Sequence, residues 1–151
     1  MDFKVNSSDL LKAISHIHGV VEIRHTLPIL SNMIITAQDG NLKLCSTNLD
    51  IYCSDQVTAD VIIPGEISVS ASTFHEIVKR LPNGSDLHAT LDEDSSSLIL
   101  KCGRSKFNLT TMKTDDFPKI ADSDLDTKFV LSAKELIRLI DKTKFAISNE
   151  E

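Results

Sequence analysis

The chain has 151 residues, a hydrophobic fraction of 41% and a formal net charge of −6. This length suits one ordinary domain, or one domain with part of a second. An acidic balance argues against a protein that coats nucleic acid with its whole surface, but it leaves room for a local basic stripe. Three cysteines without a CxxC pair predict reduced thiols. No signal-peptide pattern occurs, and no apolar run approaches the ~18 residues of a membrane helix, so we expect a cytoplasmic protein that does not enter a membrane.

The first predicted unit changes from strand to helix periodicity near the start of the chain. Phe3 and Val5 alternate with polar residues, which predicts a short strand. A helix follows, with Ser7 or Ser8 as its predicted cap and Gly19 as its end. The apolar face of this helix recurs at Leu10, Leu11, Ile14 and Ile17. Strands are then predicted at residues 29–37, 42–46 and 51–59, with a hairpin turn at residues 39–40.

The same order of elements starts twice more. A strand at residues 67–69 leads into a helix that Ser70 or Ser72 caps and that ends before Pro82, and strands follow at residues 86–91, 97–102 and 105–111. A third strand, at residues 129–131, leads into a helix that Ser132 caps. The three strands start at residues 3, 67 and 129, so the spacings are 64 (67 − 3) and 62 (129 − 67). This near-constant period indicates internal repetition.

Each unit reads β-α-β-β-β, which predicts an α+β fold. A single unit has one helix and one sheet face, too little to bury a core, so we expect two units to pair with their sheets outside and their helices side by side. The predicted first domain covers residues 1–122, with its repeats at residues 1–62 and 66–118. Residues 123–128 are a predicted linker, and residues 129–151 are the first strand and helix of an incomplete second domain.

Three segments resemble the beta sliding clamp of bacterial DNA polymerase III. Residues 24–32 read Arg-His-Thr-Leu-Pro-Ile-Leu-Ser-Asn, residues 103–107 read Gly-Arg-Ser-Lys-Phe, and residues 116–118 read Asp-Phe-Pro. They are similar to the family's R-x-T-L-P-I-L-x-N, G-R-S-x-F and D-F-P segments, and the resemblance runs from residue 3 to about residue 148. It implies the DNA-clamp fold, a ring of two subunits with three such domains each, in which helices line the hole and sheets form the outer wall. This chain would not close the ring alone.

A ring that slides on duplex DNA must attract phosphates without reading base edges. Lys134, Arg138 and Lys142 lie at i, i+4 and i+8 on the third predicted helix. On sequence alone a solvated helix face is the commoner reading of such a stripe, whereas the resemblance implies that it faces the hole. Ser72 and Thr73 stand where the family often has a basic residue, and Glu150 stands where it has a polar contact, so we expect weaker DNA attraction at those points.

Four further basic residues are candidates for DNA contact. Arg24 matches the family's DNA-contacting arginine and is the strongest single candidate, although a surface loop arginine is the alternative. Lys12 on the first helix and Lys79 and Arg80 on the second are weaker candidates, for which a solvated face turned away from the hole is the alternative.

The resemblance also implies a head-to-tail subunit interface, in which the second helix and the last strand of the first domain meet the third domain of the other subunit. The candidates are Ile77, Leu81, Phe107 and Leu109, with Arg104 and Lys106 as charged flankers. For the apolar members, burial in the core is the alternative. The strand at residues 105–111 would then be an open edge that the partner covers. We expect a homodimer of the full-length protein and a monomer of this 151-residue chain.

The function implied is that of a non-catalytic processivity clamp, with duplex DNA, the replicative polymerase and the clamp loader as partners. No cofactor or metal is expected. His16 and His18 lie two apart on a helix and point to different faces, and His25, His75 and His88 lack ligands at metal spacing. No phosphate-binding loop or nucleophile elbow occurs. The alternative is a free-standing protein-interaction module with the same fold, and a reading frame that continues past Glu151 would distinguish the two.

Overall fold

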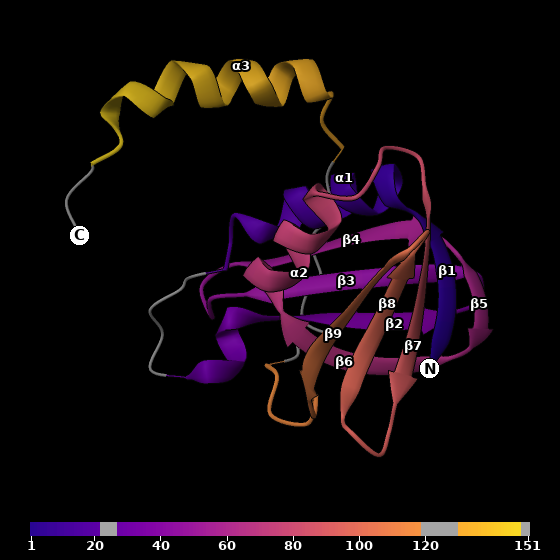
Figure 1. The fold of residues 1–151 in the computed structure, drawn as a ribbon. Helices are drawn as coiled ribbons and strands as arrows, with labels where there is room; N and C mark the ends of the chain where they lie inside the picture. Colours follow the sequence, from indigo (N-terminus) through magenta and orange to yellow (C-terminus); the bar gives the residue numbers. More distant parts are fainter. Residues whose placement is uncertain (22–26, 119–129, 149–151) are drawn as a thin grey trace. The chain divides into compact units, whose positions relative to one another are not determined.

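The computed structural model describes residues 1–21, 27–118 and 130–148. The chain divides into two compact units, Met1–Lys119 and Ile120–Glu151 (Figure 1). The predicted linker at residues 123–128 lies outside the described residues. None of the described helices has the length and apolar character that a membrane crossing requires.

The first unit is built on one antiparallel sheet of nine strands, ordered β4-β3-β2-β6-β9-β8-β7-β1-β5. In chain order its elements are β1 (Asp2–Asn6), α1 (Ser7–His18), the 3-10 turn η1 (Pro28–Ser31), β2 (Asn32–Gln38), β3 (Asn41–Thr47), β4 (Tyr52–Thr58), β5 (Asp60–Ile63), β6 (Gly65–Ser70), α2 (Ala71–Lys79), β7 (Asp86–Asp92), β8 (Ser97–Cys102) and β9 (Ser105–Met112). The α+β class predicted from the sequence is confirmed.

The sheet has two halves that meet at a narrow seam. One half contains β2, β3, β4 and β6, and the other contains β1, β5, β7, β8 and β9. Within the described residues, the halves are joined where Ser68 pairs with Met112 and Val69 with Thr111. The first strand of each repeat therefore lies in the half built by the other repeat, because β1 pairs with β7 and β6 pairs with β2.

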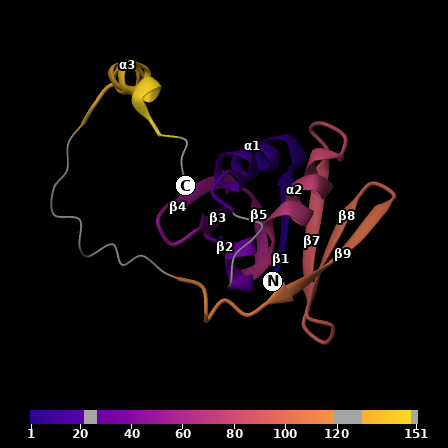
Figure 2. The ribbon, with the colours of Figure 1, turned by 90° about the vertical axis from the view of Figure 1, so that its left-hand side faces the viewer.

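Helices α1 and α2 lie side by side and cover the apolar face of the sheet (Figures 1 and 2). Phe3 of β1, Leu10 and Ile14 of α1, and Phe74 of α2 are completely buried in a single cluster to which both repeats contribute. Burying one such side chain stabilises the fold by about 1.5–3 kcal/mol. The shared cluster explains why the two units pair, since neither helix could bury its apolar face against its own repeat alone.

The cap of α1 differs from the sequence-based prediction. Asn6, and neither Ser7 nor Ser8, caps α1, because its side chain accepts a hydrogen bond from the Ser8 backbone N–H at 3.0 Å. The Ser7 hydroxyl instead donates to the Pro82 carbonyl at 2.9 Å. The Ser8 hydroxyl accepts from the Gly84 N–H at 2.8 Å. Both serines thus tie the start of α1 to the segment after α2.

One strand boundary and the number of strands also differ from the prediction. The strand predicted at residues 29–37 begins at Asn32, because Pro28 starts a 3-10 turn that occupies Pro28–Ser31. The strand predicted at residues 51–59 is β4, and a further short strand, β5, follows it and was not predicted. The remaining strands of this unit lie where periodicity placed them.

The second unit contains α3 (Ala133–Thr143) and the 3-10 turn η3 (Lys144–Ala146). Ser132 caps α3 as predicted, since its hydroxyl accepts from the Glu135 N–H at 3.2 Å. Of the strand predicted before it, Phe129 lies outside the described residues, and Val130 and Leu131 are not in a strand. No described residue of this unit is in a strand, so Val130 and Leu131 have no strand partner among the described residues of the unit.

Candidate nucleic-acid interface

The basic candidates on α1 and α2 are exposed, and two of the three are engaged on their own helix. The Lys12 ammonium lies 3.4 Å from the Asp9 carboxylate. The Arg80 guanidinium lies 3.3 Å from the Glu76 carboxylate. Lys79 has no ion pair with any described residue and is exposed. Exposed pairs of this kind stabilise a protein by about 0–1 kcal/mol, so both cations remain able to exchange their carboxylate for a phosphate.

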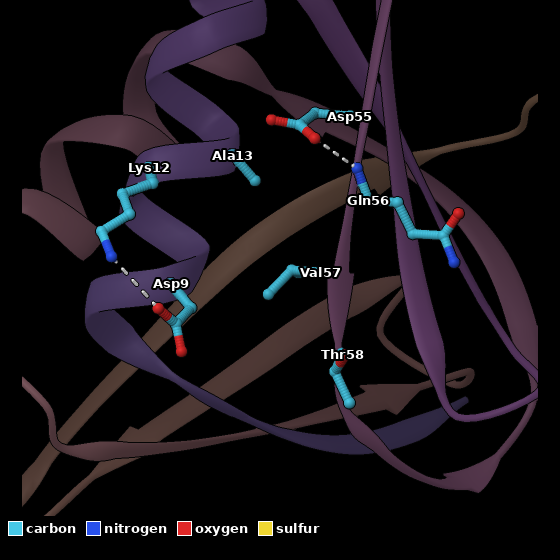
Figure 3. A pocket seen from close by; sticks show the side chains of 7 residues that line it. All are labelled: Asp9, Lys12, Ala13, Asp55, Gln56, Val57 and Thr58. Atoms are coloured by element: carbon cyan, nitrogen blue, oxygen red, sulfur yellow. Dashed lines mark hydrogen bonds and ion pairs between the residues drawn. The ribbon is translucent and has the colours of Figure 1, made fainter.

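A shallow pocket separates α1 from β4 and contains carboxylates from both elements (Figure 3). Asp9 and Lys12 line it from α1 and face one another across one helical turn. Asp55 lines it from β4 and accepts a hydrogen bond from the Gln56 backbone N–H at 2.7 Å. Two carboxylates against one lysine make this pocket a poor anion site, so it does not extend the basic surface.

His16 connects α1 to β4. Its Nδ1 lies 2.6 Å from the Asp55 carboxylate, with 70% of the His16 side chain and 31% of the Asp55 side chain exposed. The hydrogen bond with His16 lowers the pKa of Asp55 below its ordinary value, and the bond from the Gln56 N–H adds to this. The pair therefore holds Asp55 ionised and fixes α1 against the sheet.

His18 connects α1 to α2. The ring centroids of His18 and His75 are 4.5 Å apart, with an angle of 30° between the ring planes. Burial lowers the pKa of His75, the nearby charges of His18 and Lys79 lower it further, and Glu76 opposes them. The prediction that His16 and His18 point to different faces is confirmed, because His16 reaches β4 and His18 reaches α2. In the part of the chain that the structure describes, no group of three His, Cys, Asp or Glu side chains could hold a metal ion.

The stripe on α3 is exposed along its whole length within its own unit. Lys134, Arg138 and Lys142 are all exposed, and none has an ion pair with a described residue. The nearby Lys144 ammonium is instead 2.7 Å from the Asp141 carboxylate. The apolar residues Leu136, Ile137, Leu139 and Ile140 are 46–59% exposed. Arg24 and Glu150 lie outside the described residues, so the positions predicted for them stay predictions.

Strand β9 is an open edge over most of its length. It pairs with β8 from Ser105 to Thr110, whereas its other side is paired only at Thr111 and Met112 within the described residues. Leu109 is 4% exposed and belongs to the core, and Phe107 packs partly against the same core. Arg104 and Lys106 are exposed at the start of the strand.

The interface candidates on α2 and just after it also divide into one buried residue and one partly exposed residue. Leu81 is 8% exposed, whereas Ile77 packs only partly against the core. Leu81 and Leu109 thus contribute to the unit's own core, while Ile77 and Phe107 keep accessible surface. The sequence could not reveal this division, because each of the four residues lies on an apolar face.

In the sequence, His16, His18 and His75 were considered only as possible metal ligands. No local signal points to the His16–Asp55 or His18–His75 contact, since each joins residues 39 or 57 positions apart (55 − 16 and 75 − 18) on different elements. Only the packing of α1 against α2 and β4 brings them together.

The chain matches the family model described as "DNA polymerase III beta subunit, N-terminal domain" over residues 1–121. It is 41% identical over 151 residues to the beta sliding clamp of Caulobacter vibrioides, covering all of this chain and 41% of that protein. The beta sliding clamp of Pseudomonas aeruginosa is 36% identical over 152 aligned positions, again with 100% and 41% coverage. The solved structure of Caulobacter crescentus pol III beta superimposes with a TM-score of 0.95 at 41% identity, covering all of this chain and 41% of the other. The chain thus spans about two fifths of these relatives.

Proposed function

The chain belongs to the DNA polymerase III beta subunit family, and on that basis we propose that it forms part of a sliding clamp, a non-catalytic ring that keeps the replicative polymerase on duplex DNA. The observation that carries this proposal is the match over the whole chain to a beta sliding clamp, with 41% identity and a TM-score of 0.95. The ring function belongs to a longer assembly, of which this chain supplies one domain and the start of another.

On the proposed DNA side, α1, α2 and α3 face the hole and present flexible cations to the phosphates. The contacting residues are Arg24, Lys12, Lys79, Arg80, Lys134, Arg138 and Lys142. This surface suits sliding because Lys and Arg attract the backbone at long range, which carries no sequence information. The exposed Ser72 and Thr73 add no charge to α2, so α3 provides most of the attraction among the described residues.

On the proposed subunit side, the open edge of β9 and the neighbouring face of α2 meet the other subunit of a homodimer. Ile77 and Phe107 supply accessible apolar surface, Leu81 and Leu109 support them from the core, and Arg104 and Lys106 flank the contact. The unpaired backbone groups of Ser105–Thr110 support this assignment, because a partner strand satisfies such an edge. The interface is head-to-tail, so one patch meets a different patch.

The polymerase and the clamp loader bind the ring through regions mostly absent from this chain, and the complex acts in the cytoplasm. A protein-interaction module with the clamp fold that does not encircle DNA is the second candidate. The open β9 edge is the observation that favours this second candidate, because a partner other than a clamp subunit could bind there. A reading frame that continues past Glu151 into the rest of a clamp would exclude it.

The experiment that tests the proposal is a titration of a labelled duplex with the 151-residue chain at low and moderate salt. We expect weak binding that falls steeply as salt rises, because the attraction is electrostatic. Tight binding that is insensitive to salt would contradict this. Sedimentation should show a monomer, because the third domain that the β9 edge meets is absent, and a compact symmetric dimer at low concentration would contradict the proposed interface.

A further inference from the structure

Two imidazoles meet on the surface that α1 and α2 share. His18 is the last residue of α1 and His75 lies in the middle of α2, and their rings are 4.5 Å apart. Both residues are half-buried, so each ring keeps an edge in solvent. Neither has a carboxylate partner among the described residues, unlike His16, which is paired with Asp55, and His88, which is paired with Asp2 at 2.7 Å.

The electrostatics of this pair suit an anion from outside the chain. Burial is the main reason that the pKa of His75 lies below its ordinary value. The charges of His18 and Lys79 lower it further, because protonating both rings would place two positive charges in contact with a third nearby. An external phosphate would remove this repulsion, because an opposite charge within about 4–6 Å favours the charged form of an imidazole.

Among the residues that the structure describes, the other charged groups around the pair do not supply that anion. On α2, Glu76 is the carboxylate that acts on His75, and it is paired with Arg80. On α1 and β4, His16 and Asp55 are paired with one another at 2.6 Å. The remaining charged residues of the packed strands alternate with buried residues and so lie on the outer face of the sheet. They are Asp2 and Lys4 of β1, Lys43 of β3 and Glu66 of β6; β2 carries none.

We propose that His18 and His75 form a proton-dependent phosphate site, through which the surface shared by α1 and α2 holds the backbone of duplex DNA more tightly as the pH falls. This inference rests on the proposed function, since it takes the duplex as the source of the phosphate. The two rings and the Lys79 ammonium would contact one or two neighbouring phosphates. No base is read, so the site is compatible with sliding.

The test is a duplex titration of the 151-residue chain at constant low salt between about pH 8 and about pH 6, the range in which imidazoles titrate. A phosphate that raises the pKa of one imidazole by about one unit strengthens binding by at most about tenfold, the limit at a pH below both pKa values, so the gain at about pH 6 is several-fold. We expect this gain in the wild type and its loss in the His18→Gln/His75→Gln variant. The matched control is His88→Gln on the outer face, which removes an imidazole that already has a carboxylate and should keep the gain.

A second measurement does not depend on a variant that folds. Ring-carbon NMR titrations of the wild type, with and without a short duplex, should show that DNA raises the pKa of His18 and His75 and leaves that of His88 in place. This inference would be overturned if duplex DNA left the pKa values of His18 and His75 unchanged, or if the double variant showed the same pH response as the wild type. In either case, salt-dependent binding would leave the proposed function standing. Absence of any salt-dependent duplex binding would overturn both.

Discussion

The stripe on α3 offers the sharpest test of the proposed attraction between this chain and DNA. Lys134, Arg138 and Lys142 are exposed and have no ion pair with a described residue. Eight residues of helical rise separate the first from the last, which is about 12 Å. Duplex DNA carries one negative charge per about 1.7 Å of its axis, so each of the three cations can meet its own phosphate.

We therefore expect that the Lys134→Gln/Arg138→Gln/Lys142→Gln variant binds duplex DNA with a shallower salt dependence. Each lost phosphate contact lowers the slope of log affinity against log salt by about 0.9, so the total change is about 2.7. Between about 25 mM and about 100 mM salt, the wild type should lose about 40-fold more of its affinity than the variant. Fluorescence anisotropy with a labelled duplex measures both slopes.

The matched control replaces three exposed lysines on the outer sheet face, Lys4, Lys43 and Lys101, by glutamine. Each triple variant removes three positive charges from a chain of formal net charge −6. A difference between their salt slopes therefore cannot come from net charge alone. An equal loss of slope in the control, or an unchanged slope in the α3 variant, would refute a localised phosphate contact.

Four further outcomes follow from side chains of the first unit, and Phe145 of the second unit supplies a control. Phe74→Ala should lower the free energy of unfolding in denaturant titrations by about 3–5 kcal/mol, whereas Phe145→Ala, 85% exposed, should change it by less than about 0.5 kcal/mol. Asn6→Ala should cost about 1 kcal/mol in the same assay, through loss of the α1 cap. Because the pKa of His75 is lowered, the folded chain binds a proton there less readily than the unfolded chain. The free energy of unfolding should therefore have its full value above about pH 6.5 and decrease below it. Thermal melts of the His75→Gln variant should lack that part of the decrease. Asp55→Asn should cost less than about 1 kcal/mol at neutral pH, and because the pKa of Asp55 is lowered, its difference from wild type should vanish as acid protonates Asp55.

Periodicity and turn chemistry predicted most of the elements. The turn at Asp39 and Gly40 is one case, because both residues adopt positive φ, 50° and 73°, as a tight hairpin requires. The helix positions followed from apolar spacing, and Ser70 and Ser132 cap α2 and α3. These features depend on a few neighbouring residues, so local patterns determine them.

Features that depend on distant partners could not be predicted in this way. Strand β5 is an example, since its sequence Asp-Val-Ile-Ile lacks clear alternation and it is a strand because it pairs with β1. Asn6 was overlooked as a cap because Ser7 and Ser8 are equally good acceptors, and their bonds to residues 82–85 decide the matter. Candidate DNA-contact residues of α1 and α2 could be named from the sequence, but the carboxylates beside Lys12 and Arg80 became visible only in the structure.

The exchange of first strands between the two halves has a consequence for synthesis of the chain. β1 leaves the ribosome before β7, yet β7 is the neighbour that makes it an interior strand, and Ala89 of β7 pairs with Phe3. Until β7 emerges, β1 can pair only with β5, and the Phe3 side chain lacks most of its eventual surroundings. Loop closure over such a separation is slow compared with local pairing. The nascent first repeat therefore stays incomplete until β7 has been translated, so the two repeats complete their folding together.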